Sequence, residues 1–379
     1  MSDTLTQEGE FSLAEARDLV RDLFEPNPRI YWTDLLLSAI GGHLSFVAVR
    51  ALAEGLILNR AAELPAYMPE SEPLRWALLV VAFLTCCLLF YRAGTFIHEL
   101  VHLRSGSFRW FRLAYNGLCG IPFLMPSFVY LTHVDHHRRK HYGTEADGEY
   151  LPLSHWPTRY IVFYLLEAFV VPPLAFLRFL VFTPISWVFP AFRRWMHQRA
   201  SSMIIDPRYL RPLPTAEDRN LIRRQEVFCF LYLMILVFGV WWWQGYFPAA
   251  LLAQAYLTGV TIVLINGVRT VSAHRWTNDG HSEMTFVDQM LDSVNVPGND
   301  WFNALWGPLG MRFHALHHLF PSMPYHNMPA AHRRLMEKLP EDSPYRRTNE
   351  PSLFAAFAKL WRRTRQGSGR PAASEQLSA

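Results

Sequence analysis

The sequence is poor in charged residues. Asp, Glu, Lys and Arg make up 18% of its 379 residues, whereas hydrophobic residues make up 51% and aromatic residues 15%. This balance favours a membrane protein over a pair of soluble domains. The formal net charge is only +4, and no long basic run is interleaved with aromatic residues, so we expect no nucleic-acid partner.

Cysteine is scarce, and a secretion signal is missing from the start of the chain. The acidic, helix-forming segment 1–28 lacks the basic start and short apolar core of such a signal, which predicts a cytoplasmic helix there. The cysteines lie in apolar stretches without C-x-x-C spacing, which argues against a disulfide framework and against a cysteine-based zinc site. We expect packing roles for all four: Cys86, Cys87, Cys119 and Cys229.

Long apolar runs are what the sequence has in abundance. A membrane-spanning helix needs about 20 mostly apolar residues. Segment 34–58 is long enough but carries His43, Arg50 and Glu54, so it spans only if these side chains face protein or water. With it, four segments are predicted to span: 34–58, 74–97, 227–247 and 249–268.

Two further apolar stretches are not predicted to span. Segment 117–131 is too short, and segment 160–189 is interrupted by Pro172 and Pro173, so we expect both to be re-entrant or interfacial. Arginine and lysine residues follow the second span and both of these stretches, and such residues favour the cytoplasmic side. This pattern predicts that both termini are cytoplasmic.

The fold class expected from these features is all-α. We expect a multi-pass membrane protein with about four transmembrane helices, additional re-entrant or interfacial helices, and a cytoplasmic histidine-rich cap. Three regions follow along the chain: an N-terminal cytoplasmic helix over residues 1–33, a membrane domain over 34–335, and a cytoplasmic C-terminal tail over 336–379.

Histidines are the most informative residues. Eight of the sixteen form three clusters, spaced i, i+4 in the first and i, i+3, i+4 in the other two. On a helix, side chains at this spacing project from one face, so three helices could surround one centre. Structural packing alone explains such clustering poorly. The clusters are His98 and His102; His133, His136 and His137; and His314, His317 and His318.

Two metal chemistries compete for these residues. Residues 98–102 match H-E-x-x-H, the motif of zinc proteases in which two histidines bind the metal and the glutamate is the base. A catalytic zinc takes three protein ligands and keeps one open position, which would leave five clustered histidines without a role. Two metals can use them all. A non-enzymatic metal-binding scaffold or sensor is a further alternative.

The motifs H-x-x-x-H, H-x-x-H-H and H-x-x-H-H, in this order and between paired spans, resemble the integral-membrane fatty acid desaturase and hydroxylase superfamily. The likeness covers roughly residues 74–331, and "HALHHLFPSMPYH" is similar to the third histidine box of acyl-lipid desaturases. The resemblance implies two non-haem iron ions as cofactors, O2 as co-substrate, and a hydrophobic channel that holds an acyl chain.

The leading functional prediction is an acyl-lipid desaturase whose substrate is a fatty acid, acyl-lipid or acyl thioester. Alternatives are a fatty acid hydroxylase, a desaturase-like decarboxylase that forms terminal alkenes, and a carotenoid hydroxylase or ketolase. The chain has no H-P-G-G haem motif and no G-x-G-x-x-G after a predicted strand, so a separate electron donor of ferredoxin or cytochrome type is implied. Basic residues near the C-terminus could steer an acidic carrier, although such charges are ordinarily membrane-facing or solvated; they are Arg333, Arg334, Arg346, Arg347 and those within 362–365.

Other residues are given roles by the same reasoning. The superfamily commonly supplies one more histidine from the end of the last span, and we expect His274 rather than His281, which follows a turn signal. Thr270 stands where related motifs place asparagine. Glu99 and Asp135 are candidates to accept a hydrogen bond from an imidazole, although a solvated or salt-bridged carboxylate is an equal alternative.

The aromatic-rich segment 237–247 is a candidate wall of the acyl channel. Gly239 and Gly259 would then be small positions at which bulky residues change chain-length preference. A lipid-facing aromatic belt is the alternative for residues 241–243.

Overall fold

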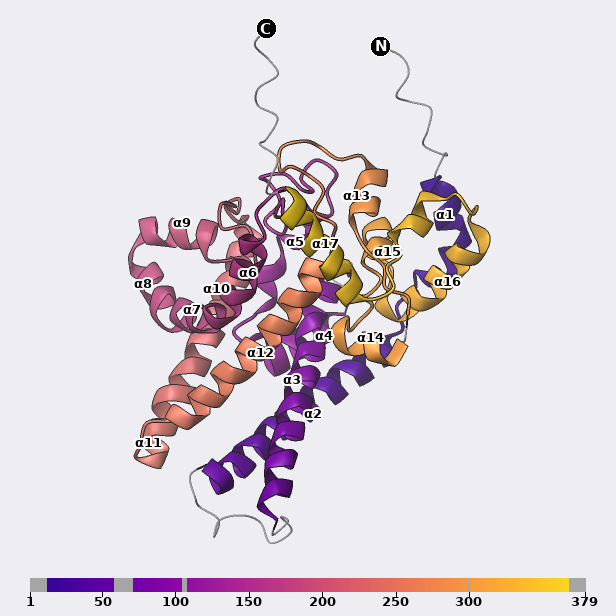
Figure 1. Cartoon of the computed structure of the whole chain (residues 1–379). Helices are drawn as coiled ribbons and strands as arrows, with labels where there is room; N and C mark the ends of the chain where they lie inside the picture. Colours follow the sequence, from indigo (N-terminus) through magenta and orange to yellow (C-terminus); the bar gives the residue numbers. More distant parts are fainter. Residues whose placement is uncertain (1–11, 58–70, 104–107, 299, 368–379) are drawn as a thin grey trace.

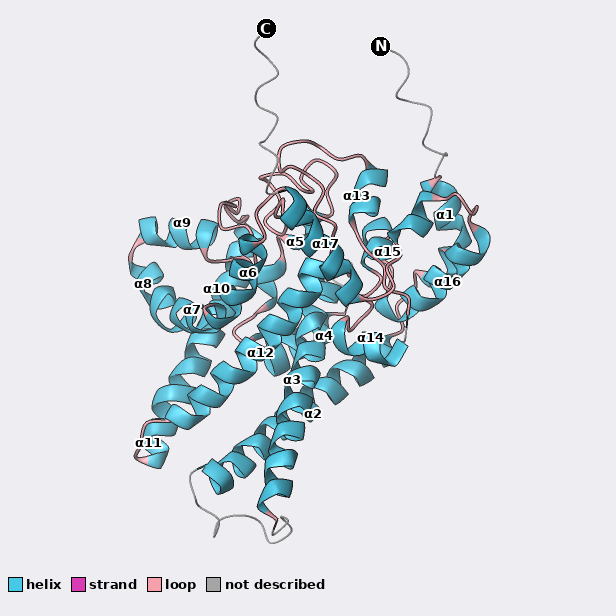
Figure 2. Ribbon diagram, in the orientation of Figure 1, coloured by secondary structure: helices cyan, strands magenta, loops and turns pink. Residues whose placement is uncertain are grey.

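The computed structural model describes residues 12–57, 71–103, 108–298 and 300–367. Within these ranges the only regular secondary structure is helical, apart from three isolated β-bridges (Figure 2). The predicted all-α class is therefore confirmed.

Two long helical hairpins contain the four predicted spans and extend in the same direction, away from the half of the molecule that holds α13 (Phe286–Asp292) and α15 (His314–Leu319) (Figure 1). In the second hairpin, the turn η7 (Ile235–Gly239) and α11 (Val240–Gln244) prolong the first helix. The four long helices are α2 (Pro28–Ile57), α3 (Glu72–His102), α10 (Ala216–Met234) and α12 (Ala249–Ala273).

The helices of the first hairpin are longer than predicted. α2 begins at Pro28, because the first turn of a helix leaves backbone N–H groups unpaired and tolerates a residue that has none. α3 continues to His102, so the first histidine cluster occupies its last turns. The hairpin therefore carries two metal-ligand candidates directly to the end of a membrane span.

Polar side chains in α2 have protein partners. His43 Nε2 lies 2.8 Å from the carbonyl oxygen of Leu118, and Arg50 pairs with Glu54 at 2.6 Å, one turn further along the helix. These contacts meet the condition under which this segment was predicted to span.

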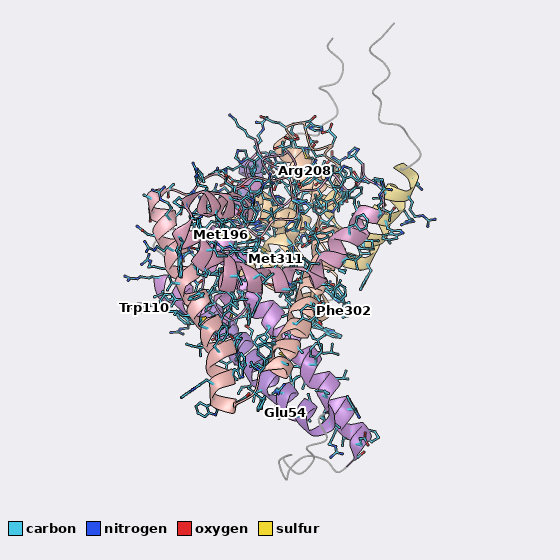
Figure 3. All side chains as sticks on the ribbon, turned by 90° about the vertical axis from the view of Figure 1, so that its left-hand side faces the viewer. Glu54, Trp110, Met196, Arg208, Phe302 and Met311 are labelled. Atoms are coloured by element: carbon cyan, nitrogen blue, oxygen red, sulfur yellow. The ribbon has the colours of Figure 1, made fainter. Side chains whose placement is uncertain are left out.

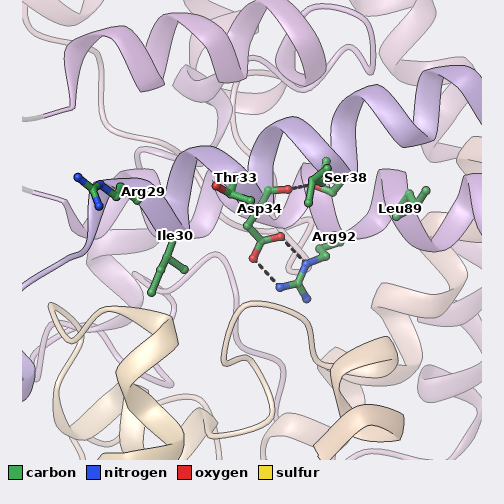
Figure 4. Close-up of a pocket in the computed structure, with 8 residues that line it drawn as sticks. Arg29, Ile30, Thr33, Asp34, Ser38, Leu89 and Arg92 are labelled. Atoms are coloured by element: carbon green, nitrogen blue, oxygen red, sulfur yellow. Dashed lines mark hydrogen bonds and ion pairs between the residues drawn. The ribbon is translucent and has the colours of Figure 1, made fainter.

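Close packing and one ion pair fix α2 against α3. A Cβ atom on Gly42 would lie 2.3 Å from the ring of Phe90, so glycine permits this approach. Arg92 of α3 donates two hydrogen bonds to Asp34 of α2, at 2.6 and 2.5 Å (Figure 4). The Tyr325 hydroxyl donates to the same carboxylate at 2.7 Å, which ties the hairpin to the cap.

The proline-containing segment differs from expectation. Its residues Val171–Val188 form a fifth helix that is long and apolar enough to span, built from α7 (Val171–Leu177), η6 (Arg178–Phe182) and α8 (Thr183–Val188). The prolines do not interrupt it, because they lie in the first turn of α7. η6 packs against α10 at one side of the hairpins (Figure 1).

Segment 117–131 forms only short turns, namely η3 (Asn116–Gly120) and η4 (Ser127–Tyr130), which agrees with its predicted inability to span. The remaining helices surround the ends of the long ones: α1 (Leu13–Leu19), α4 (Arg109–Tyr115), α5 (His133–His136), α6 (Arg159–Leu166), α9 (Pro190–Arg199), α13 (Phe286–Asp292), α14 (Asp300–Trp306), α15 (His314–Leu319), α16 (Met328–Lys338) and α17 (Leu353–Gly367).

α17 shows how the cap is attached. It packs against α12, with Leu360 buried beside Val271.

The four cysteines are buried and unpaired, as expected of packing residues.

Exposed aromatic side chains surround the apolar half. Trp110 and Phe302 project from opposite sides at a similar level, between Glu54 at one end of the molecule and Arg208 at the other (Figure 3). Trp242 and Trp243 at the far tip are 87% and 85% exposed, which favours an aromatic belt over a channel wall.

Gly239 lends the channel interpretation no support either. A Cβ atom added to it would approach only Ile235, which lies one turn earlier in the same helical segment.

Candidate metal centre

Nine histidines converge where the ends of α3 and α12 meet α5 and α15. They form two groups, and within each group the candidate ligand nitrogens all lie within 4.8 Å of one another. Group one contains His98, His102, His133, His137 and His317, and group two contains His136, His274, His314 and His318.

The second and third sequence clusters are each divided between the groups. His133 and His137, four residues apart, belong to group one, whereas His136 belongs to group two. The third cluster is also divided: its four-apart pair belongs to group two and His317 to group one. Residues four apart differ by only about 40° around a helix, so each such pair points to one centre and the third imidazole to its neighbour. The three helices therefore surround two centres rather than one.

The two groups are in direct contact. The imidazole rings of His137 and His318, one from each group, have centroids 4.4 Å apart. Within group one, His137 Nε2 lies 3.0 Å from the Nε2 atoms of both His133 and His317. Within group two, His314 Nε2 lies 2.9 Å from His274 Nε2. The ring nitrogens thus converge on two adjacent points.

Carboxylates orient several of these rings from outside. In group one, His133 Nδ1 donates to Glu149 at 2.9 Å, and the Tyr130 hydroxyl donates to the same carboxylate at 3.2 Å. The Tyr130 ring also stacks on His133, with centroids 4.6 Å apart. A ring that donates through Nδ1 presents the lone pair of Nε2 to the centre.

Group two has two such anchors. His136 Nδ1 donates to Asp147 at 2.8 Å. His274 Nδ1 lies 2.9 Å from the hydroxyl of Tyr142, which in turn donates to Asp292 at 2.8 Å. His274 therefore reaches its carboxylate through a tyrosine.

Burial keeps most of these imidazoles uncharged. His136 is the exception: burial opposes its protonation, but the Asp147 carboxylate outweighs burial and raises the pKa of His136 above its ordinary value. A neutral imidazole is the form that binds a metal. Burial lowers the pKa of six others well below the ordinary value: His133, His137, His274, His314, His317 and His318.

Buried nitrogens without a protein partner test whether a metal fits. Both ring nitrogens of His98 and Nε2 of His102 have no hydrogen-bond partner. Nδ1 is likewise without a partner in His137, His314 and His317. A buried unsatisfied polar atom costs roughly 1–3 kcal/mol. A cation in each group would bind one nitrogen of each ring, and imidazole suits iron, zinc, copper and nickel. The residues therefore fit two metal ions.

Several sequence predictions have a clear structural outcome. His274 lies in group two, directly after α12 ends at Ala273, whereas His281 is exposed outside both groups. Glu99 accepts a hydrogen bond from the Tyr31 hydroxyl at 2.5 Å, and Asp135 pairs with Arg138 at 2.7 Å. Among the described contacts neither carboxylate binds a clustered imidazole. The salt-bridged alternative was correct for Asp135, whereas Glu99 is buried and hydrogen-bonded to a tyrosine, which neither alternative predicted.

Sequence reasoning missed the carboxylates that do bind the imidazoles. Asp147 and Glu149 share the loop after the second cluster, in the stretch "EADGEY", and Asp292 ends α13. Two acidic residues, two positions apart and shortly after a histidine cluster, were the pattern that could have indicated these partners. Nothing local to Asp292 indicated that it would face Tyr142.

The fold and the site define an integral membrane protein, all-α in class, with a histidine-lined centre able to hold two metal ions. The fatty acid desaturase family matches residues 74–349, and the chain belongs to this family. Enzymes of this family oxidise fatty acyl chains, so the protein is an oxidoreductase that acts on such chains. A ceramide hydroxylase from Caulobacter vibrioides (strain NA1000 / CB15N) is 38% identical over 364 residues, which cover 93% of each chain. No solved structure matches.

Proposed function

We propose that this protein is an O2-dependent lipid hydroxylase with two non-haem iron ions, and that its substrate is a ceramide-type lipid. The observation that carries a metal-dependent oxidation is the convergence of nine histidines into two adjacent groups. The ceramide hydroxylase supports both the reaction and the substrate class, since the similarity extends over nearly the whole of both chains. This relative moves our proposal from desaturation, which the sequence alone favoured, to hydroxylation.

Iron is the metal that suits this reaction. Bound iron supplies, with O2, the oxidising power to break a C–H bond of an unactivated methylene, which no side-chain acid or base can do. The nine imidazoles carry no negative charge, in contrast with the carboxylate-rich di-iron sites of soluble helical bundles.

The protein's own groups bind, orient and exclude water. Glu149 and Asp147 hold the Nδ1 protons of His133 and His136, so that the Nε2 atoms of these rings remain available as ligands. Most of the nine histidines are buried, which keeps bulk water from the centre. The adjoining apolar helices provide the surroundings that a lipid chain requires.

Desaturation is the second candidate, because it is the reaction for which the family is named. Both reactions begin at the same kind of C–H bond and differ in whether oxygen is added or a second hydrogen is removed. Positioning of the chain decides between them.

Lipid analysis tests the proposal. The protein is expressed in a host that makes ceramide but not its additionally hydroxylated form, and lipids are analysed by mass spectrometry. We expect ceramide species that have gained one oxygen atom. Species that have lost two hydrogens would instead establish a desaturase, and an unchanged ceramide profile would contradict the proposed substrate.

We also propose that the histidine groups and both termini face the cytoplasm. A cysteine introduced at Arg139 should be protected from a membrane-impermeant thiol reagent in intact cells, and one at Gln244, the last residue of α11 before the turn to α12, should react. The opposite labelling pattern would reverse the orientation. The electron donor is proposed to be a separate carrier protein.

A further inference from the structure

A pocket of about 350 Å³ lies over His274, outside the two histidine groups. We propose that it is the docking site for a small acidic protein that delivers electrons one at a time. This inference rests on the proposed function, which requires an external source of electrons. It assigns a place on the molecule to that source.

The pocket is built on the end of α12. His274 is its innermost polar residue and is almost fully buried, at 4% exposure. It is also the member of the nine histidines that lines this pocket. Its Nδ1 is held by Tyr142 and its Nε2 faces His314, so the pocket is lined by a member of group two itself.

The walls of the pocket are fixed by hydrogen bonds. Arg275, the residue after His274, donates to the carbonyl oxygens of Leu291 at 2.8 Å and Arg347 at 2.5 Å. α17 supplies the opposite wall with Lys359 and Arg363, and Arg363 donates to the carbonyl oxygen of Arg275 at 3.4 Å. The site is therefore formed before any partner arrives.

Positive charge dominates the lining. Four cationic side chains stand against one carboxylate, Glu350, which pairs with Lys359 at 2.5 Å. Arg347, Lys359 and Arg363 are exposed and lie around the entrance. A surplus of exposed positive charge accelerates association with an acidic partner. This acceleration decreases as the salt concentration increases.

Two other basic residues near the C-terminus have structural roles. Arg334 pairs with Asp22, and Arg346 donates to the carbonyl oxygens of Pro340, Met336 and Leu339. The charge that we assign to docking is that of the cations that line the pocket beside His274.

A lipid headgroup explains this pocket less well. Ceramide carries no charge, so the substrate does not require four cations. An anionic membrane lipid would be attracted by the charge, but its binding gives no reason for a metal-ligand candidate at the base of the pocket. An electron carrier accounts for both features.

The electron balance is complete. Two carrier molecules are each oxidised by one electron. With two protons, these two electrons allow one atom of O2 to enter the C–H bond as a hydroxyl group, while the other atom leaves as water. Electrons that enter at the pocket meet His274, a member of group two, directly in its lining.

Carrier binding tests the proposal without reliance on turnover. Surface plasmon resonance on the full chain in nanodiscs would use two acidic probes, a plant-type ferredoxin and the haem domain of cytochrome b5. The test variant is Arg347→Glu with Arg363→Glu. Its matched control is Arg223→Glu with Arg224→Glu, which changes the net charge equally on the exposed face of α10.

We expect the test variant to lower the association rate of at least one probe by roughly tenfold or more at low salt, with little effect in the control. Equal loss in both variants, or no binding of either probe by the wild type, would overturn the docking site. If the test variant retained less anionic lipid than the wild type but bound the carriers equally well, the docking site would also be overturned, and the pocket would be assigned to binding of membrane lipids.

A second measurement separates this inference from the proposed function. In place of the carrier, dithionite reduces the protein under anaerobic conditions, the excess dithionite is removed, and ceramide and O2 are then added for a single turnover. Equal product from wild type and test variant, together with impaired carrier binding, supports docking. No hydroxylated product from the wild type contradicts the proposed function, while the binding data still decide the docking site.

Discussion

The two histidine groups are anchored differently. In group two, His136 and His274 are each oriented by a carboxylate, one directly and one through Tyr142, and only Nδ1 of His314 is buried without a partner. In group one, a carboxylate orients His133, while five ring nitrogens of the other members have no partner. Protein contacts therefore orient more of the rings in group two, whereas in group one His98 and Nε2 of His102 would gain a partner only from a metal.

Removal of a ligand should produce the largest effect. We expect His98→Ala from group one and His314→Ala from group two each to lower turnover by more than about 100-fold, which exceeds the usual cost of losing an outer partner. Each should also lower iron content by about one ion per chain. His281→Ala is the matched control because that residue is exposed outside both groups. Full activity in either ligand variant would remove that group from the reaction.

The outer carboxylates should have the next largest effect. Asp147→Asn should weaken metal binding at group two by about 10- to 100-fold, because the amide lacks the negative charge and one of the two acceptor oxygens that hold His136 and the neighbouring backbone N–H groups. Metal titration followed by tryptophan fluorescence or calorimetry measures this. Asp135→Asn is the control, since Asp135 binds Arg138 rather than a clustered histidine. Glu149→Gln should weaken group one less, and a larger effect there would reverse our comparison.

Metal loading should stabilise the fold. Zinc serves as a redox-inert substitute for iron, and at about 100 times its dissociation constant it contributes about 2.7 kcal/mol. Thermal unfolding in detergent should then shift upward by roughly 5 °C or more. In His98→Ala the shift should be smaller than in wild type. An equal shift in both would show that group one gains nothing from the metal.

The smallest expected effect concerns a buried histidine outside both groups. Burial, with help from Arg312 and Arg333, lowers the pKa of His332 to about 4. Its unfolded pKa is near 6.5, so the stability from its neutral form is present above pH 6.5 and is lost as the pH falls toward 4. At pH 5 this loss is about 2 kcal/mol.

His332→Gln should therefore lose less thermal stability than wild type between pH 7 and pH 5, by a few degrees. His281→Gln, at an exposed position, should behave as wild type. Identical pH profiles for wild type and His332→Gln would contradict the role of burial.

Local patterns were sufficient to predict the spans and the histidines. Apolar length determined the four long helices, and His274 was placed by its position after the last span. The division of the second and third clusters between two groups was not predictable, because it depends on which direction α5 and α15 face after folding. Pro172 and Pro173 do interrupt segment 160–189, since α6 ends at Leu166 and α7 begins at Val171. The long apolar helix that starts there was not predicted, because proline at a helix start and proline within a helix look alike without a boundary.

The remaining features of the site could not be predicted, because they depend on contacts between residues that are distant in the sequence. Asp292 reaches His274 through Tyr142, which lies 150 residues from Asp292. The basic pocket forms only when α17 packs against α12 and brings Lys359 and Arg363 beside Arg275. No periodicity along the chain reports either arrangement.

The metal content of active protein tests the central claim most directly. Protein purified under anaerobic conditions, reconstituted and shown to hydroxylate ceramide should contain about two iron ions per chain by elemental analysis, one for each histidine group. Removal of the iron should abolish the activity, and its return should restore it. Full activity with a single zinc ion and no iron would contradict the account.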